Sequence, residues 1–150
     1  MRLIIQRVTK ASVHIDGKIH SSIDKGLLIL LGIEPADNQE DIDWLCGKIA
    51  RLRIFDDSNN IMNLSVQDIQ GSCLVVSQFT LFASTKKGNR PSYIRAAQPE
   101  IAIPLYEKFI ETLIHTTELS VKTGIFGANM QIELTNDGPV TILIDSKNRE

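Results

Sequence analysis

One stretch of the sequence is apolar without interruption: Gly26-Leu27-Leu28-Ile29-Leu30-Leu31-Gly32-Ile33. A strand that is buried on both faces reads as such a continuous run, because neither face needs polar side chains. We therefore predict a central strand of a sheet here, which Pro35 ends. The longest purely aliphatic run, residues 27–31, is far shorter than the roughly 18 residues that a membrane-spanning helix needs. We expect no membrane partner.

Further strands are expected on both sides of this one. Asp16-Gly17 is a strong signal for a two-residue hairpin turn, because glycine accepts a positive φ and aspartate tolerates it. This turn places His14 opposite Ile19 and Val13 opposite His20. Strands are predicted at 2–9, 11–15, 18–23, 72–81, 129–135 and 139–145, with a short one at 53–55.

Two helices are predicted between the strands. Residues 38–51 have apolar positions at helical spacing after Asp37 and Glu40, which form a capping-box pattern. Residues 104–117 have a second apolar stripe, with Pro104 in the first turn, where its missing N–H costs nothing. Many strands with two helices predict an α+β fold in which the helices cover one face of the sheet.

Length and composition fit one soluble domain, residues 1–150. A chain of 16.7 kDa with 43% hydrophobic and 23% charged residues is neither disordered, collagen-like nor a coiled coil. The apolar stretch at the N-terminus is too short for that of a signal peptide. Cys46 and Cys73 have no metal-binding spacing, which favours free buried thiols in a reducing cytosol. A cytoplasmic protein is therefore expected.

Charge limits the partners. Sixteen basic and eighteen acidic residues give a net charge of −2, so no overall basic field attracts nucleic acid. Lys86-Lys87-Gly88-Asn89-Arg90 is either a solvated loop or a local phosphate contact. His14, His20 and His115 lack the spacing of a metal site, and we expect no metal or other cofactor.

Two polar segments could carry chemistry. Ser77-Gln78-Phe79-Thr80-Leu81 follows an apolar strand, and it is either a strand emerging into solvent or a strand end that presents donors to a carbonyl oxygen. Asn136-Asp137-Gly138-Pro139-Val140-Thr141 is a hairpin turn by its composition. A functional reading of it would require a cis Gly-Pro bond, and about one X-Pro bond in twenty is cis.

Five segments together resemble the D-aminoacyl-tRNA deacylase family. They are residues 1–8, Ser77-Gln78-Phe79-Thr80-Leu81, residues 88–92, Phe126-Gly127-Ala128-Asn129-Met130 and Asn136-Asp137-Gly138-Pro139-Val140-Thr141. The resemblance runs from residue 1 to about residue 145, so it covers the fold and not one motif alone. Two separated motifs in the family's order, Ser-Gln-Phe-Thr-Leu and a Gly-Pro near the C-terminus, make it specific.

The resemblance implies a compact, barrel-like β structure with two helices and an enzymatic activity. The family hydrolyses the ester that joins a D-amino acid to the terminal adenosine of tRNA. It also acts on glycyl-tRNA, because glycine has no side chain to reject. Further implications are a cytoplasmic homodimer with its active sites at the dimer interface, the aminoacylated 3′ end of tRNA as partner, and neither DNA nor a cofactor.

The resemblance also suggests roles for individual residues. Gly138-Pro139 matches a cis dipeptide that enters the partner's pocket, binds the substrate's amino group through its carbonyls and excludes an L side chain. Arg7 matches a residue that orients this dipeptide. Phe126 and Met130 match positions near the adenosine end of the pocket. Catalysis is expected from Ser77, Gln78, Phe79 and Thr80.

An aminoacyl ester is activated, so its hydrolysis needs little beyond positioning and oxyanion stabilisation. Thr80 is the natural nucleophile candidate, yet no His or Lys is plainly placed to activate it. We favour the backbone N–H groups of Phe79 and Thr80 as donors to the carbonyl, with the tRNA 2′-OH orienting or activating water. The alternatives are a non-enzymatic RNA-binding or dimerisation module and a small general hydrolase that uses Thr80 or Cys73.

Overall fold

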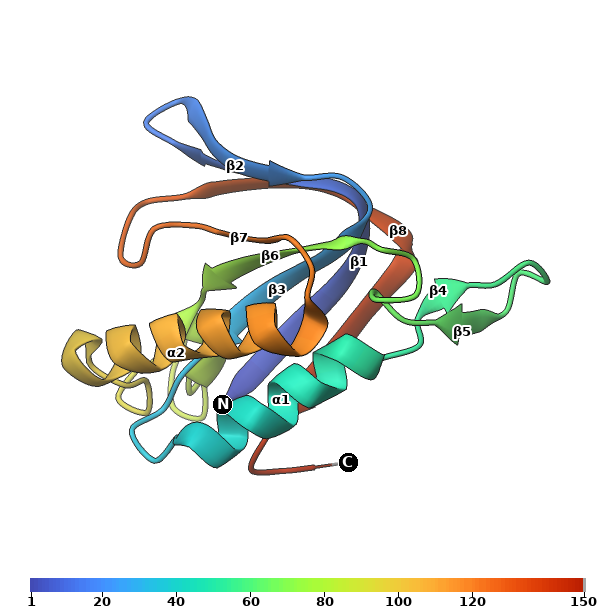
Figure 1. Ribbon diagram of the computed structural model, residues 1–150. Coiled ribbons are helices and arrows are strands. Elements are labelled where there is room, and N and C mark those ends of the chain that lie inside the picture. The colour runs from blue at the N-terminus through green and yellow to red at the C-terminus, as the bar shows by residue number, and fades with distance from the viewer. Residues whose placement is uncertain (150) are drawn as a thin grey trace.

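The apolar stretch forms β3 (Gly26–Gly32), a strand inside a mixed six-stranded sheet. The computed structural model describes residues 1–149. Strand β1 (Arg2–Ile15) pairs antiparallel with β3, and β6 (Ser72–Ser77) pairs parallel with the other side of β3. The sheet curls until it is nearly closed into a barrel, with both helices on one side (Figure 1). The predicted α+β class and barrel-like shape are confirmed.

The outer strands complete the sheet. The order is β2-β1-β3-β6-β7, and β8 pairs antiparallel with β1 along most of its length. A separate ribbon of β4 and β5 projects to one side (Figure 1). The bounds of the remaining elements are β2 (Lys18–Ile23), α1 (Gln39–Arg51), β4 (Phe55–Asp56), β5 (Met62–Leu64), a 3₁₀ turn η1 (Phe79–Phe82), α2 (Pro99–Thr117), β7 (Val121–Thr123) and β8 (Gln131–Asp145).

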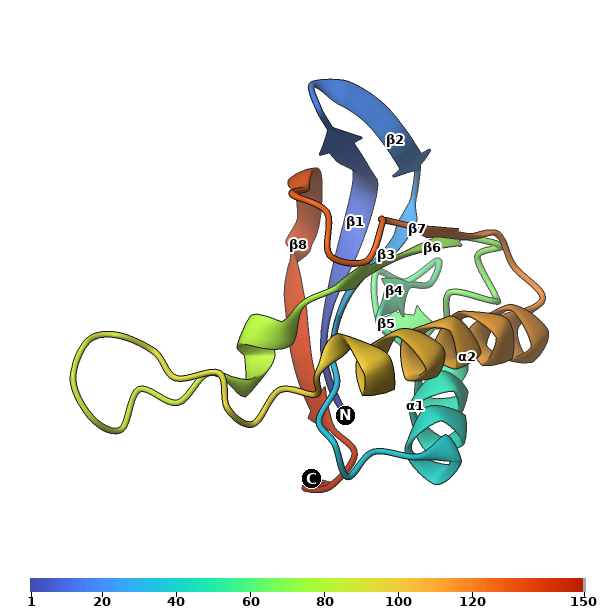
Figure 2. The same ribbon diagram turned by 90° about the vertical axis from the view of Figure 1, so that its left-hand side faces the viewer.

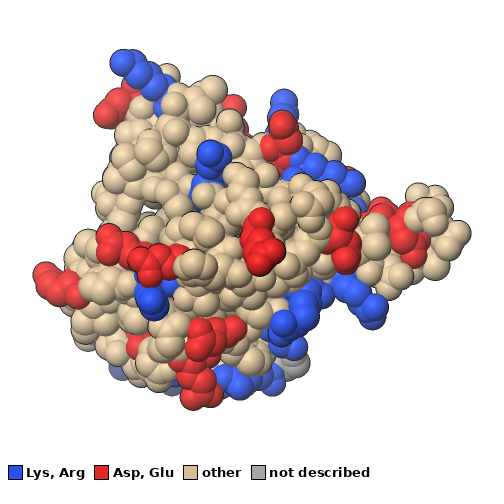
Figure 3. All heavy atoms as spheres, viewed as in Figure 1, with Lys and Arg blue, Asp and Glu red and all other residues tan. Residues whose placement is uncertain are grey.

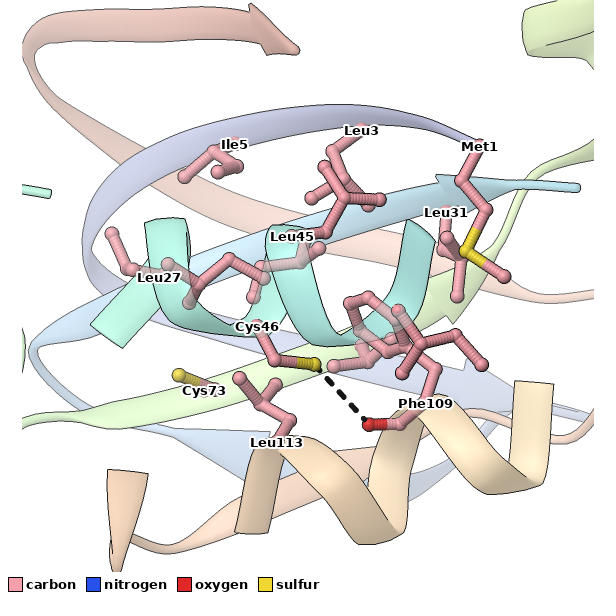
Figure 4. Packing of buried hydrophobic residues seen from close by; sticks show 14 of the residues in the cluster. Met1, Leu3, Ile5, Leu27, Leu31, Leu45, Cys46, Cys73, Phe109 and Leu113 are labelled. Carbon is pink, nitrogen blue, oxygen red and sulfur yellow. Dashed lines mark hydrogen bonds between the residues drawn. The ribbon is translucent and has the colours of Figure 1, made fainter. Parts of the chain in front are cut away.

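Strand β3 is buried on both faces, as predicted. Leu27, Ile29 and Leu31 belong to the main core between the sheet and the helices, whereas Leu28 belongs to a second cluster on the opposite face. Successive side chains of a strand point to opposite faces, so one apolar run supplies both cores. Figure 4 shows the main core, in which side chains of β1 and β3 meet residues of α1 and α2, such as Phe109.

Several element boundaries differ from the prediction. The strands predicted at 2–9 and 11–15 are one strand, β1. Those predicted at 129–135 and 139–145 are also one strand, β8. Its pairing with β1 shifts register twice, between Gln6 and Val8 and between Val8 and Lys10. Proline fits there because β8 lies at a sheet edge, where an N–H can be missing from the ladder. The strand predicted at 72–81 stops at Ser77 and continues as η1.

The helix starts also differ. The capping box of α1 is formed by Asn38 and Asp41, not by Asp37 and Glu40. Asp37 instead accepts a hydrogen bond from the Met1 ammonium group in the protein interior. Helix α2 begins five residues before Pro104, at Pro99. No helix within residues 1–149 has the length and apolarity needed to cross a bilayer.

The predicted hairpin forms at Asp16 and Gly17, where both residues have positive φ values of 50° and 74°. His14 lies opposite Ile19 as expected. Val13 lies opposite Ser21 and not opposite His20, because the register shifts by one residue between Val13 and His14. The predicted hairpin is confirmed, whereas the sequence did not predict the bulge within it.

Candidate active site

A cavity of about 290 Å³ opens where β3 and β6 end. Five of the residues that sequence analysis selected contribute to its wall: Ser77, Gln78, Phe79, Phe126 and Met130. The ends of parallel strands are a common place for ligand sites, because the chain leaves the sheet there and exposes backbone groups. This volume is close to the lower end of the range for small-molecule sites, about 300–1,000 Å³.

The wall at Ser77-Gln78-Phe79 is held from both sides. The Gln78 N–H donates to the Leu31 carbonyl of β3 at 2.7 Å, and the Gln78 side-chain amide donates to the Thr80 hydroxyl at 2.5 Å. Residue Phe79 is 55% exposed, and its ring makes an edge-to-face contact with Tyr93, at 5.1 Å between ring centroids. The strand end is therefore fixed in orientation before the chain turns into η1.

Two neighbouring backbone donors, the N–H groups of Phe79 and Thr80, lie at this strand end. Within the described residues, no hydrogen bond from the N–H of Phe79 or Thr80 is found, while Leu81 N–H donates to Gln78 O. The first N–H groups of a helical turn have no partner inside the turn. Such groups can donate to an oxygen that gains negative charge.

Thr80 lies at the boundary between two hollows. It lines a second, larger hollow of about 720 Å³, together with Arg2 and Leu143, and does not line the first cavity. In the described part of the chain the only side-chain partner of its hydroxyl is Gln78. A hydroxyl needs an adjacent base to become a nucleophile, and Gln78 supplies none.

The opposite wall of the cavity is the segment 126–130, between β7 and β8. Phe126 packs edge-to-face against Tyr106 of α2, with 5.7 Å between ring centroids. Gly124 makes room for Met130, because a Cβ atom at residue 124 would lie 2.4 Å from the Met130 sulfur. The segment therefore presents one aromatic and one thioether side chain to the cavity, both suited to the face of a base.

Gly138, Pro139 and Arg7 form a second group, away from this cavity. The Gly138-Pro139 bond is cis, as the functional reading required. Arg7 is 6% exposed, and it donates to the Asp137 carbonyl at 2.9 Å and to the Ile54 carbonyl at 2.6 Å. Among the described residues, none from 133 to 142 lines the cavity. One chain therefore holds the predicted site residues in two separate places.

Cys73 and a metal centre are the remaining candidates. Burial raises the pKa of the Cys73 thiol to about 12, so it is not a nucleophile near neutral pH. The residues described in the structure contain no group of three or more His, Cys, Asp or Glu side chains that could hold a metal ion. Sequence analysis did not single out Ile33, Ala97 or Ala102, which also line the cavity. Their small or aliphatic side chains give no signal in a sequence.

Comparisons with known proteins identify relatives of the whole chain. The profile of the family described as "D-Tyr-tRNA(Tyr) deacylase" matches residues 4–145. The chain is similar to proteins named D-aminoacyl-tRNA deacylase from Flavobacterium johnsoniae (63% identity), Flavobacterium psychrophilum (65%) and Bacteroides fragilis (63%). Each of these matches covers 100% of both chains.

Two solved structures have the same fold. One, titled "c-Myc DNA Unwinding Element Binding Protein", is 42% identical, with a TM-score of 0.91 over 97% of this chain and 98% of its own. The other, described as a probable eukaryotic D-amino acid tRNA deacylase, is 15% identical. Its TM-score is 0.80, over 95% of this chain and 97% of its own, and it supports the fold alone.

Proposed function

Since the chain belongs to the D-Tyr-tRNA(Tyr) deacylase family and is a hydrolase, we propose that it removes D-amino acids, and glycine on non-cognate tRNA, from the tRNA 3′ end. The reaction cleaves the ester bond and releases the free amino acid and tRNA. The observation that carries the proposal is the cavity at the end of β6, whose wall includes Phe79. Within the described residues, the N–H groups of Phe79 and of the adjacent Thr80 have no hydrogen-bond partner. We further propose that residues 1–150 act as one cytoplasmic domain without a cofactor.

The proposed chemistry uses positioning and backbone donors. Water attacks the ester carbonyl carbon, and the negative charge on the carbonyl oxygen is stabilised by the N–H groups of Phe79 and Thr80. The 2′-OH of the terminal ribose orients the water, and the 3′ oxygen leaves with a proton. Ser77 and Gln78 position the strand end, and Phe126 and Met130 hold the adenosine. Preorganised donors of this kind contribute about 2.7–4 kcal/mol to lowering a barrier.

Selectivity for D substrates is proposed to come from a second copy of the chain. In a homodimer, Gly138-Pro139 of one protomer would enter the partner's cavity and exclude an L side chain, because a rigid backbone does not yield to a clash. Two observations support this arrangement. Gly138-Pro139 lies outside the cavity of its own chain, and β8 pairs only with β1 among the described strands, which leaves an open sheet edge. Arg7 would hold the 137–139 segment in place.

A second reading is an RNA-binding or dimerisation module without turnover. The 42% identical structure has a title that describes binding to a DNA element and no hydrolysis. This reading predicts that the protein binds tRNA and leaves its ester intact.

The test is to incubate the protein with D-tyrosyl-tRNA and with L-tyrosyl-tRNA and to follow ester loss over spontaneous hydrolysis. The proposal predicts rapid loss of the D ester and near-background loss of the L ester. Glycyl-tRNA on a non-cognate tRNA is expected to behave like the D ester. Binding without loss of either ester would support the second reading and contradict the proposal.

A further inference from the structure

One loop of the chain carries several basic side chains and no acidic one. Residues 69–99 contain four basic side chains and no acidic one, while the other 119 residues carry twelve basic and eighteen acidic side chains. All four belong to residues 84–95, here named the basic loop. Over the helical face of the molecule, acidic and basic side chains are interspersed (Figure 3). The charge of the chain is therefore segregated, although its total is close to zero.

The base of the basic loop is built into the wall of the cavity. The loop leaves η1 and returns before α2, and it projects far from the body of the molecule (Figure 2). Ser84 and Ser92 exchange two backbone hydrogen bonds of 2.8 and 2.9 Å, which close the loop. Beyond this bridge, Tyr93 packs on Phe79, and the Ala97 N–H donates to the Ile33 carbonyl at 2.9 Å. Phe79, Ile33 and Ala97 all line the cavity.

The cations at the tip make no contact with an acidic or hydrogen-bonding group among the described residues. Within residues 1–149, no hydrogen bond or ion pair involves the side chain of Lys86, Lys87 or Arg90, and all three residues are exposed. Arg95 at the base differs, because it pairs with Glu34 at 3.5 Å and lies over the Phe82 ring. Three free cations near one another suit a chain of phosphates better than a single small anion.

The distance from the base of the basic loop to its tip corresponds to a few nucleotides of a nucleic acid strand. About three residues on each side of the turn extend past the Ser84–Ser92 bridge, so the tip reaches roughly 10 Å from it. A nucleic acid strand advances about 3.4 Å per nucleotide. The tip is therefore on the order of three nucleotides from the loop base.

We propose that the basic loop binds the phosphates of the tRNA strand that leads from the terminal adenosine into the acceptor stem. The inference rests on the proposed function, because it takes the cavity to hold that adenosine. Lys86, Lys87 and Arg90 make the phosphate contacts, and they set affinity for tRNA without taking part in ester cleavage. The loop thus distinguishes an ester on tRNA from the same ester on a free nucleoside.

The test is a triple variant, Lys86→Ala/Lys87→Ala/Arg90→Ala, assayed on D-tyrosyl-tRNA and on D-tyrosyl-adenosine. On tRNA we expect kcat/KM to fall at least about tenfold at 0.1 M salt, through KM, with kcat unchanged. The slope of log KM against log salt should fall by about 2, as for three lost contacts to a single strand. Hydrolysis of D-tyrosyl-adenosine should stay at the wild-type rate.

The control is Lys18→Ala/Lys108→Ala/Lys122→Ala, which removes three exposed cations from other elements, one of which, Lys108, pairs with Glu111 at 3.3 Å. It should retain the wild-type KM and salt slope. An equal loss in the control, an equal loss on both substrates, or an unchanged KM in the loop variant would each overturn the proposal. Failure of the wild-type protein to hydrolyse D-tyrosyl-tRNA would instead overturn the proposed function, so the two failures are distinguishable.

Discussion

Arg7 is a charged residue in a buried position, and its hydrogen bonds explain why it is tolerated there. Its guanidinium group joins three parts of the chain, since it donates to the carbonyls of Ile54 and Asp137 and lies 3.4 Å from the Asp56 carboxylate. A planar group with donors in a fixed fork holds two carbonyls in set directions, whereas a lysine ammonium is a compact charge with freely rotating donors. Arg7 therefore anchors the Gly138-Pro139 segment at the point where the β1–β8 pairing shifts register.

Arg7→Met should lower the free energy of unfolding and weaken D/L discrimination. The Ile54 carbonyl would lose its donor, at a cost of about 1–3 kcal/mol, and residues 137–139 would lose their anchor. Urea denaturation and the ratio of deacylation rates on D- and L-tyrosyl-tRNA measure the two effects. Arg51→Met, at an exposed position, is the control and should change stability by less than about 0.5 kcal/mol. A variant with wild-type stability and selectivity would contradict the role given to Arg7.

Thr80→Val should retain activity within about tenfold of the wild type, because its backbone N–H and not its hydroxyl acts on the substrate. Steady-state deacylation of D-tyrosyl-tRNA measures this, with Thr85→Val, at an exposed loop position, as the control. A loss of about a thousandfold, roughly 4 kcal/mol in the barrier, would instead identify Thr80 as the nucleophile.

At the scale of elements, the start of α1 is joined to the C-terminal segment through one carboxylate. Asp41 accepts from the Asn38 N–H at 3.0 Å and from the Lys147 ammonium at 2.7 Å. Burial alone would raise the pKa of Asp41, but the hydrogen bonds from Lys147, Ser146 and Asn38 outweigh it and lower that pKa below its usual 3.8. The unfolded chain therefore binds a proton here at a higher pH than the folded chain does.

The sign of this shift predicts how stability depends on pH. The contribution of Asp41 is complete above its unfolded pKa and is lost as the pH falls below about 4, through the lower folded pKa. The unfolding free energy of Asp41→Asn should thus lie below that of the wild type at pH 7, and the gap should shrink in acid. Urea denaturation from pH 7 to pH 3 measures the gap. If the difference in unfolding free energy between the wild type and Asp41→Asn grew in acid, the downward direction of the Asp41 pKa shift would be contradicted.

The elements that the sequence predicted are those decided by burial and by local turn chemistry. β3 and the Asp16-Gly17 hairpin were predicted because an apolar run and a positive-φ turn are properties of a few neighbouring residues. β8 was predicted as two strands because Pro139 is a turn signal, and only its position at a sheet edge makes it compatible with one strand. β5 and β7 were not predicted. Each has three residues, which is too few for a recognisable pattern, and each is a strand only because it pairs with a neighbouring strand.

At the scale of the whole molecule, the two groups of candidate residues were found by different means. The cavity brings Ser77, Gln78 and Phe79 to Phe126 and Met130 from a distant part of the chain, and no local pattern predicts that meeting. Only the family resemblance linked Gly138-Pro139 to them. A single chain leaves these two groups apart, and the proposed active site therefore requires two copies of the chain.

The protein should be a homodimer. Leu143 on the edge strand β8 is 65% exposed, beside the hollow that Thr80 and Leu81 line, and a second copy would cover this surface. Light scattering at micromolar concentration should report twice the 16.7 kDa of one chain. Particles of one chain only would refute the shared site.

Subunit complementation tests the shared site most directly. Ala128→Trp fills the cavity of its own chain, since Ala128 lines it. Gly138→Val disturbs the gate, because Gly138 has a φ of +130° and a Cβ there would lie 2.8 Å from Val140 and 3.0 Å from Arg7. Each variant alone should be a dimer with impaired deacylation: the first without activity, the second without D/L discrimination.

The two variants are then unfolded and refolded together, and the D-selective deacylation of tyrosyl-tRNA is measured. A mixed dimer has one site that combines an open cavity with an intact gate. Half of the dimers are mixed, so about one quarter of the sites should regain D-selective activity. Recovery to about that level is the predicted result. No recovery, with mixed dimers verified by mass, would contradict the claim that each active site is built from two chains.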